Sequence, residues 1–240
     1  MGPLVNGASL TDARLRELER SWQASGSVED EAAWLLERVR AGALTHDQLE
    51  RARPFSEAAR LTWAHLREQE RVKGGKRGRR GRTTRTEKER DAPPRRSFAW
   101  PLRDLDDSTC VRLGVAAVIV ALERSTSPAQ RLTRAVLEGG ALPSLIAAVD
   151  DPTPEQLQRV REGRPRLDDQ LAQTARFAAN AVLNGKWEQG DLDEDEWHSV
   201  VQALRIGAKV AAEAEGPFLG LVDAVVARWI LRGSTSLLAR

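Results

Sequence analysis

Residues 108–124 of this 240-residue chain read STCVRLGVAAVIVALER and contain its longest run without a polar side chain. That run, residues 113–122, is much shorter than the roughly 20 residues of a membrane-spanning helix, so we expect a helix buried in a protein core. Because apolar residues lie on nearly every side, this helix is predicted to be central in its domain. Its β-branched residues also permit a strand. We favour the helix, because the alanines promote it and no partner strands follow in the sequence.

Helix start and stop signals divide the sequence that follows. Ser127-Pro128-Ala129-Gln130 offers an N-cap, a proline in the first turn and a capping-box glutamine, and Thr153-Pro154-Glu155-Gln156 repeats the pattern. We expect these two helices to end at Gly139-Gly140 and Gly163. Apolar stripes predict further helices over about 171–185, 197–216 and 217–233. The C-terminal part, residues 98–233, is therefore predicted to be a bundle of about six helices.

Residues 10–70 predict a smaller helical module. One helix ends before Gly26, and Ser27 caps a second, which closes at Gly42. Thr45-His46-Asp47-Gln48 has the composition of a capping box, and Ser56 is expected to cap the last helix of the module. The whole chain is accordingly predicted to be all-α.

Residues 71–97 separate the two parts and are predicted to form a flexible, Arg-rich linker. No apolar residue lies between Val72 and Ala92, so the segment cannot build a core. Residues 71–96 contain twelve basic and three acidic residues, a net charge of +9, whereas the chain as a whole carries +2. The rest of the chain therefore carries −7.

This basic segment is a candidate for nucleic-acid binding through residues 73–96. Its densest part would contact phosphates in a salt-dependent and sequence-independent way, through Lys76, Arg77, Arg79, Arg80 and Arg82. Two observations weigh against this function. No aromatic residue lies between Trp63 and Phe98 to stack on bases, and 32 arginines against five lysines indicate a GC-rich bacterial genome. Alternatively, the linker only tethers the two parts of the chain, or it folds back onto the acidic domains of the same chain.

Catalytic motifs are missing from the sequence. His46, His65 and His198 have no metal-binding or catalytic spacing, and no nucleophile elbow, P-loop or dinucleotide fingerprint is present. Cys110 begins the most apolar helix, where a free cysteine usually acts as a small hydrophobe. We therefore expect a protein that is not an enzyme and uses no cofactor. An enzyme whose site is assembled from dispersed residues is a poorer alternative.

The acidic run at residues 191–196 is similar to the first half of a calcium-binding loop. Such a loop needs glycine at its sixth position and glutamate at its twelfth, where this chain has Glu196 and Gln202. We expect no metal site here. Instead, Asp193 is predicted to cap a helix whose dipole the other acids complement.

Most of the seven tryptophans are expected to anchor helix packing. Trp34 is the exception, because it falls outside the apolar stripe formed by Ala32, Leu35 and Val39. An exposed tryptophan on a small module is a candidate anchor for a protein interface. We nevertheless favour the alternative, in which Trp34 also belongs to the core.

Residues 18–49 resemble a helical segment found at the start of uncharacterised bacterial proteins. The resemblance rests on LERSW at 18–22, VEDEAAWLLERVRAG at 28–42 and the stretch 44–49. Some of those proteins are similar to immunity proteins of polymorphic toxin systems, which neutralise a toxin by binding it. The resemblance implies non-enzymatic binding of another protein and identifies no site residues.

The single cysteine and the lack of a signal peptide in MGPLVNGASL predict a reducing, cytoplasmic location without a membrane span. We therefore expect a cytoplasmic protein that binds another protein as an adaptor or immunity-type partner. A nucleic-acid-associated protein is the alternative.

Overall fold

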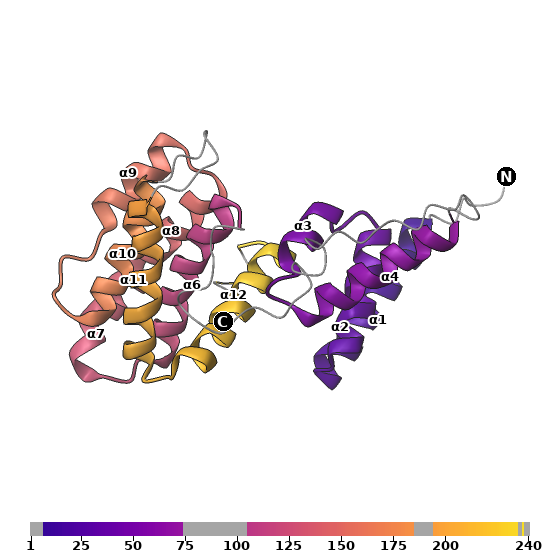
Figure 1. Ribbon diagram of the computed structural model, residues 1–240, viewed down its shortest axis with the longest axis horizontal. Coiled ribbons are helices and arrows are strands. Elements are labelled where there is room, and N and C mark those ends of the chain that lie inside the picture. Colours follow the sequence, from indigo (N-terminus) through magenta and orange to yellow (C-terminus); the bar gives the residue numbers. More distant parts are fainter. Residues whose placement is uncertain (1–6, 74–104, 185–193, 235–236, 238–240) are drawn as a thin grey trace. The chain divides into compact units, whose positions relative to one another are not determined.

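The computed structural model describes residues 7–73, 105–184, 194–234 and 237 (Figure 1). The chain divides into two compact units, Met1–Pro93 and Pro94–Arg240. Every regular element among the described residues is helical, which confirms the all-α class. Residues 71–73, predicted to begin the linker, are instead the last residues of a helix, and residues 74–97 of that linker lie outside the described ranges.

The first unit contains four described helices, listed here with their bounds: α1 (Gly7–Ser25), α2 (Val28–Arg40), α3 (His46–Ala52) and α4 (Glu57–Lys73). Helix α2 packs against both α1 and α4, and α3 packs against α4. Leu35 and Leu49 are fully buried in this small core. Buried Thr62 donates its hydroxyl hydrogen to the Ala32 and Ala58 carbonyls, with the oxygens 3.1 and 2.8 Å away. This shared donor ties α4 to α2.

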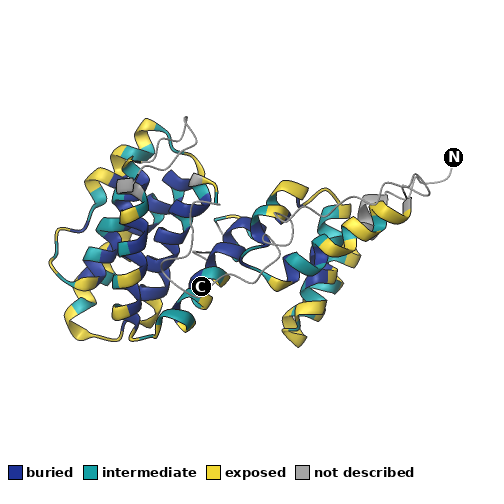
Figure 2. Ribbon diagram, viewed as in Figure 1, coloured by how far each residue is buried: buried dark blue, intermediate teal, exposed yellow. Residues whose placement is uncertain are grey.

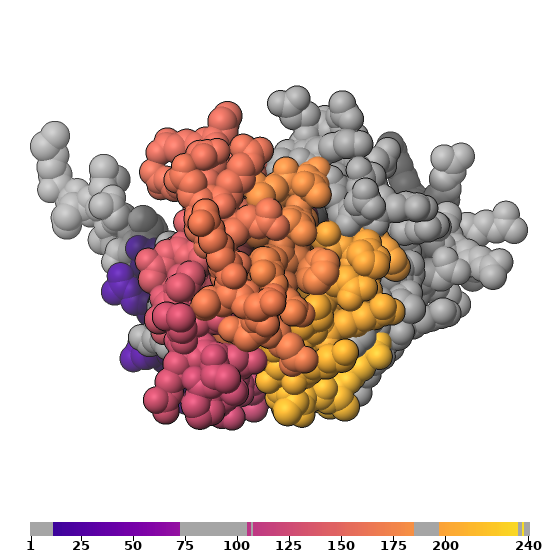
Figure 3. Space-filling model, turned by 90° about the vertical axis from the view of Figure 1, so that its left-hand side faces the viewer, coloured from indigo at the N-terminus to yellow at the C-terminus, as the bar shows by residue number. Residues whose placement is uncertain are grey.

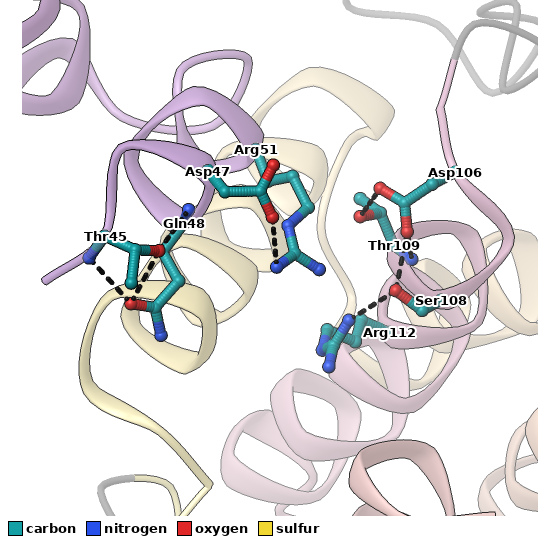
Figure 4. Close-up of polar contacts among 8 residues, drawn as sticks. All are labelled: Thr45, Asp47, Gln48, Arg51, Asp106, Ser108, Thr109 and Arg112. Atoms are coloured by element: carbon teal, nitrogen blue, oxygen red, sulfur yellow. Dashed lines mark hydrogen bonds and ion pairs between the residues drawn. The ribbon is translucent and has the colours of Figure 1, made fainter.

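The predicted caps of the first unit are present. The Ser27 hydroxyl accepts from the Asp30 backbone N–H at 3.1 Å. Thr45 and Gln48 form a complete capping box, in which each side chain accepts from the other residue's backbone N–H (Figure 4). Gly42 follows α2 with φ of 71°, a left-handed conformation that favours glycine. Local chemistry therefore sets the bounds of α2 and α3.

The second unit is a bundle around one helix, α6 (Asp107–Arg124). From residue 109 to residue 122 every residue of α6 except Arg112 is buried (Figure 2). Asp106 caps it by accepting from the Thr109 backbone N–H at 3.0 Å (Figure 4). The prediction of a central buried helix is confirmed. Around α6 the chain forms α7 (Arg131–Val136), α8 (Leu142–Asp150), α9 (Pro154–Gly163), α10 (Gln170–Asn184), α11 (Glu194–Ala211) and α12 (Glu215–Arg232).

Four of these helices, α8, α10, α11 and α12, contact α6 directly. Small residues let them approach closely. Gly114 of α6 lies against Val200 of α11 and the backbone of Ala178 of α10. At Gly207 of α11 the approach is tighter, because a methyl group there would lie 2.9 Å from the Phe218 ring and 3.3 Å from the Ala117 carbonyl oxygen.

The segment after α6 differs from the prediction. Pro128–Gln130 forms a 3-10 turn in which Ser127 makes no cap, and the Gln130 side chain accepts instead from the Ser125 hydroxyl. At Gly140 the backbone leaves the helical conformation, with φ of 164° and ψ of −29°, so the chain breaks at the predicted Gly139-Gly140, but a further helix, α8, begins directly after this kink. Burial of Leu145, Ile146 and Val149 accounts for this extra helix, which the prediction of about six omitted.

One helical stretch among the described residues, Pro128–Asp150, is long and apolar enough to cross a membrane by length and composition alone. Such a stretch is weak evidence for a span, because the core helix of a soluble protein passes the same test. Here a kink at Gly140 divides the stretch, and its second half, α8, packs against α6, α9 and α10. This packing fits a core helix.

Replacement of Gly207 by alanine tests the close approach of α11 to α6. We expect Gly207→Ala to lower the free energy of unfolding by about 1–2 kcal/mol, because overpacking outweighs the gain in helix propensity. Gly114→Ala is the matched control, since its added methyl group meets neighbours at 3.7–3.9 Å, an ordinary contact distance. Urea unfolding compares the two. A Gly207→Ala protein as stable as the control would contradict the packing described.

Candidate functional site

The outer face of α7 exposes large apolar side chains. Leu132 is 63% exposed and Val136 is 40% exposed, one helical turn apart, and Ala135 beside them is also exposed. The other large hydrophobic residues exposed in the described part of the chain, Val28 and Val72, lie apart on α2 and α4. We call Leu132, Ala135 and Val136 the α7 surface. Figure 3 views the face of the second unit on which the segment around α7, in pink, lies at the surface.

The inner face of α7 is tied to two neighbouring helices. Buried Thr133 donates its hydroxyl hydrogen to the carboxylate of Asp169, which also caps α10 by accepting from the Ala172 backbone N–H at 2.9 Å. Arg134 donates to the Leu122 carbonyl and, at 2.7 Å, to the Ser125 carbonyl, both at the C-terminal end of α6. Its positive charge there also complements the α6 dipole. The short helix α7 is therefore held in place by ties to α6 and α10.

The chain kinks soon after α7, where Gly140 leaves the helical conformation with φ of 164° and ψ of −29°. Leu137 before the kink is fully buried, and the Ser144 hydroxyl donates to the Gly140 carbonyl at 2.8 Å. This kink separates α7 from α8.

A polar cluster at one end of the bundle has a structural role. Asp150 of α8 accepts from the Trp229 indole N–H at 2.8 Å and pairs with Arg112 of α6 at 3.3 Å. The Arg112 guanidinium also lies 5.4 Å from the centre of the Trp229 ring. Trp229 itself is buried, as predicted. These contacts join α6, α8 and α12, so we assign the cluster to stability.

Trp34 is buried, so the favoured prediction of a core residue is confirmed and the candidate of an exposed interface anchor is wrong. It is 5% exposed, and its ring stacks on Trp22 with the centroids 5.2 Å apart and the planes 13° apart. The Arg38 guanidinium lies 4.8 Å from the centre of the Trp34 ring. The buried arc of α2 is wider than its aliphatic stripe, because both α1 and α4 pack against α2.

A second aromatic site in the first unit was not predicted. Trp63 is half-buried, not fully in the core, and lies within 5.5 Å of the guanidinium carbons of Arg53 and Arg67. The His46 ring meets it edge-on at 6.4 Å. We call these four residues the Trp63 cluster. The one signal for it in the sequence is the spacing of four between Trp63 and Arg67 on a helix.

The remaining predicted positions fall into two groups. Several lie outside the described residues: Lys76, Arg77, Arg79, Arg80, Arg82 and the acids Asp191 and Asp193. Cys110 is described and is fully buried in α6. Within the described ranges no group of three His, Cys, Asp or Glu side chains could hold a metal ion.

Asp169 offers a direct test of the attachment of α7. We expect Asp169→Ala to lower the free energy of unfolding by about 1–3 kcal/mol, because it removes a helix cap and leaves the buried Thr133 hydroxyl without its acceptor. The neighbouring Asp168→Ala should change stability by at most about 0.5 kcal/mol, because the Asp168 side chain is 96% exposed. Urea denaturation measures both. Equal effects would show that α7 is not held through Asp169.

No family model, curated protein or solved structure matches the chain. The likeness of residues 18–49 to immunity-type proteins therefore stays a prediction from sequence.

Proposed function

We propose that this chain is a non-enzymatic, cytoplasmic protein whose function is to bind another protein, as an adaptor or as an immunity-type partner. The observation that carries the proposal is the α7 surface, where Leu132 and Val136 are exposed on a helix whose opposite face is fixed. Apolar side chains one turn apart are the anchors with which a helix enters the groove of a partner.

The hydrogen bonds that hold α7 in place favour binding of a partner protein. Arg134 and Thr133 fix the helix on α6 and α10 before any partner arrives. Association with a partner would therefore cost α7 little conformational entropy. Burying the exposed part of Leu132 on association would add a favourable hydrophobic contribution.

The composition of the described residues supports a non-enzymatic role. The single thiol, that of Cys110, is buried in the most apolar helix instead of lining a surface site. The resemblance of residues 18–49 to immunity-type proteins also favours protein binding. The alternative function, binding of nucleic acid through residues 73–96, is favoured by the +9 charge of the basic segment.

Site-specific photocrosslinking tests the α7 surface. A photoreactive amino acid placed at Leu132 of the full chain, in the cells that naturally make it, should yield a discrete adduct with one protein. We expect the additional change Val136→Glu to abolish the adduct, because a carboxylate would be desolvated at the contact. The same amino acid at Val72, which is 68% exposed, is the matched control. Identical adducts from both positions would contradict the proposal.

Retention on immobilised DNA or RNA across a salt series tests the alternative. If the five residues Lys76, Arg77, Arg79, Arg80 and Arg82 each neutralise one phosphate, their change to glutamine should reduce the slope of log affinity against log salt by about 3.5–4.5. Deletion of residues 74–96 should abolish retention. Retention that survives this deletion would rule out the linker as the binding element.

A further inference from the structure

The α7 surface belongs to a stripe of exposed residues that has the spacing of helix pairing. The stripe continues past the end of α7, because the backbone leaves the helical conformation only at Gly140. Its exposed members, at positions i, i+3, i+4 and i+7, are Leu132, Ala135, Val136 and Gly139. A methyl group at Gly139 would meet no other part of the described chain within 4 Å. One end of the stripe therefore carries a large side chain, and the other end is open.

One edge of this stripe carries opposite charges at its two ends. Arg131 and Glu138 are both exposed, and they lie seven residues apart, which is about two helical turns, so they share an edge of the helix. Glu138 also pairs with Arg134 at 3.4 Å, and a carboxylate can accept hydrogen bonds from more than one donor. An edge that is positive at one end and negative at the other is complementary to the same edge turned end to end.

We propose that the α7 surface also pairs with the α7 surface of a second copy of this chain, antiparallel and about a two-fold axis. An axis midway between Arg131 and Glu138 brings each of these residues beside the other one in the second copy. Leu132 of one copy then lies over the gap between Ala135 and Gly139 of the other, as a knob in a hole. A closed, two-fold contact of this kind is the commonest way in which identical chains associate.

The pairing would regulate access to the α7 surface, because one surface cannot hold a partner protein and a second copy at the same time. This regulatory role rests on the proposed function, whereas the pairing itself does not. The contact centres on one short helix, and small interfaces are weak and transient. A partner that makes a larger contact would therefore displace the second copy. The hydrogen bonds of Thr133 and Arg134 hold α7 in place in both states.

Sedimentation velocity of the full chain, from micromolar to millimolar concentration, tests the pairing. The mean mass should rise with concentration from that of one chain toward that of two. We expect Arg131→Glu and Glu138→Arg each to weaken the dimer about tenfold, because both contacts across the axis then join like charges. Leu132→Glu should abolish the dimer, because a carboxylate would be desolvated at the contact. Circular dichroism of each variant checks that the helices are intact.

Mixing the two charge variants is the most specific measurement. A dimer of one Arg131→Glu chain with one Glu138→Arg chain has opposite charges at both contacts, so the mixture should recover the original affinity to within about threefold. Arg205→Glu is the matched control, because it makes the same change of charge at an exposed position on α11. This variant should change the affinity by at most about twofold, since salt screens a charge remote from the contact.

Three results would overturn the proposal. A chain that stays monomeric at millimolar concentration does not pair, and a mixture that associates no better than its separate variants excludes the antiparallel arrangement. Equal losses in Arg131→Glu and Arg205→Glu would show that only net charge matters. The proposed function can fail separately. A chain that dimerises in sedimentation, and that is crosslinked from Leu132 only to itself in cells, has a second copy but no adaptor or immunity-type partner at α7.

Discussion

Burial of α6 on almost all sides is the constraint on which the second unit depends. A helix whose apolar side chains face every direction needs neighbours around its whole circumference, and α8, α10, α11 and α12 supply them. Each fully buried valine or leucine contributes about 1.5–3 kcal/mol. Close packing of these neighbours requires small residues such as Gly114 and Gly207 at the contacts. Helix α7 does not pack extensively on α6 and is positioned instead by hydrogen bonds to the C-terminal end of α6.

The α7 surface combines two physical properties that favour association. The inner-face hydrogen bonds of Thr133 and Arg134 fix the helix and leave Leu132 exposed. The groups facing solvent are therefore ordered by contacts made behind them, which lowers the entropic cost of binding. The second property is the charge pattern of one edge, where Arg131 and Glu138 lie at opposite ends. The first property serves any partner, whereas the second favours another copy of the same chain.

Features determined by local chemistry or by an all-round apolar pattern could be predicted from the sequence. The burial of α6 and the capping box at Thr45 belong to this group.

Features that depend on which helices meet could not be predicted. The burial of Trp34 requires α1 to pack on α2, and the Trp63 cluster requires Arg53 to reach across from the end of α3. The two glycines before α8 correctly indicated a break, which lies at Gly140, but not the further helix that starts directly after it, where Leu145 and its neighbours are buried. The residues that form the α7 surface and the Trp63 cluster therefore emerged only with the fold.

The order of helices along the chain also has a consequence for synthesis. Helix α6 ends at Arg124, but its last partner, α12, ends at Arg232. At the usual rate of translation, roughly 5–20 residues per second, the ribosome needs about 5–20 s to make the intervening chain. During that time the most apolar helix of the protein lacks its full set of neighbours, and a nascent-chain chaperone has a defined segment to protect.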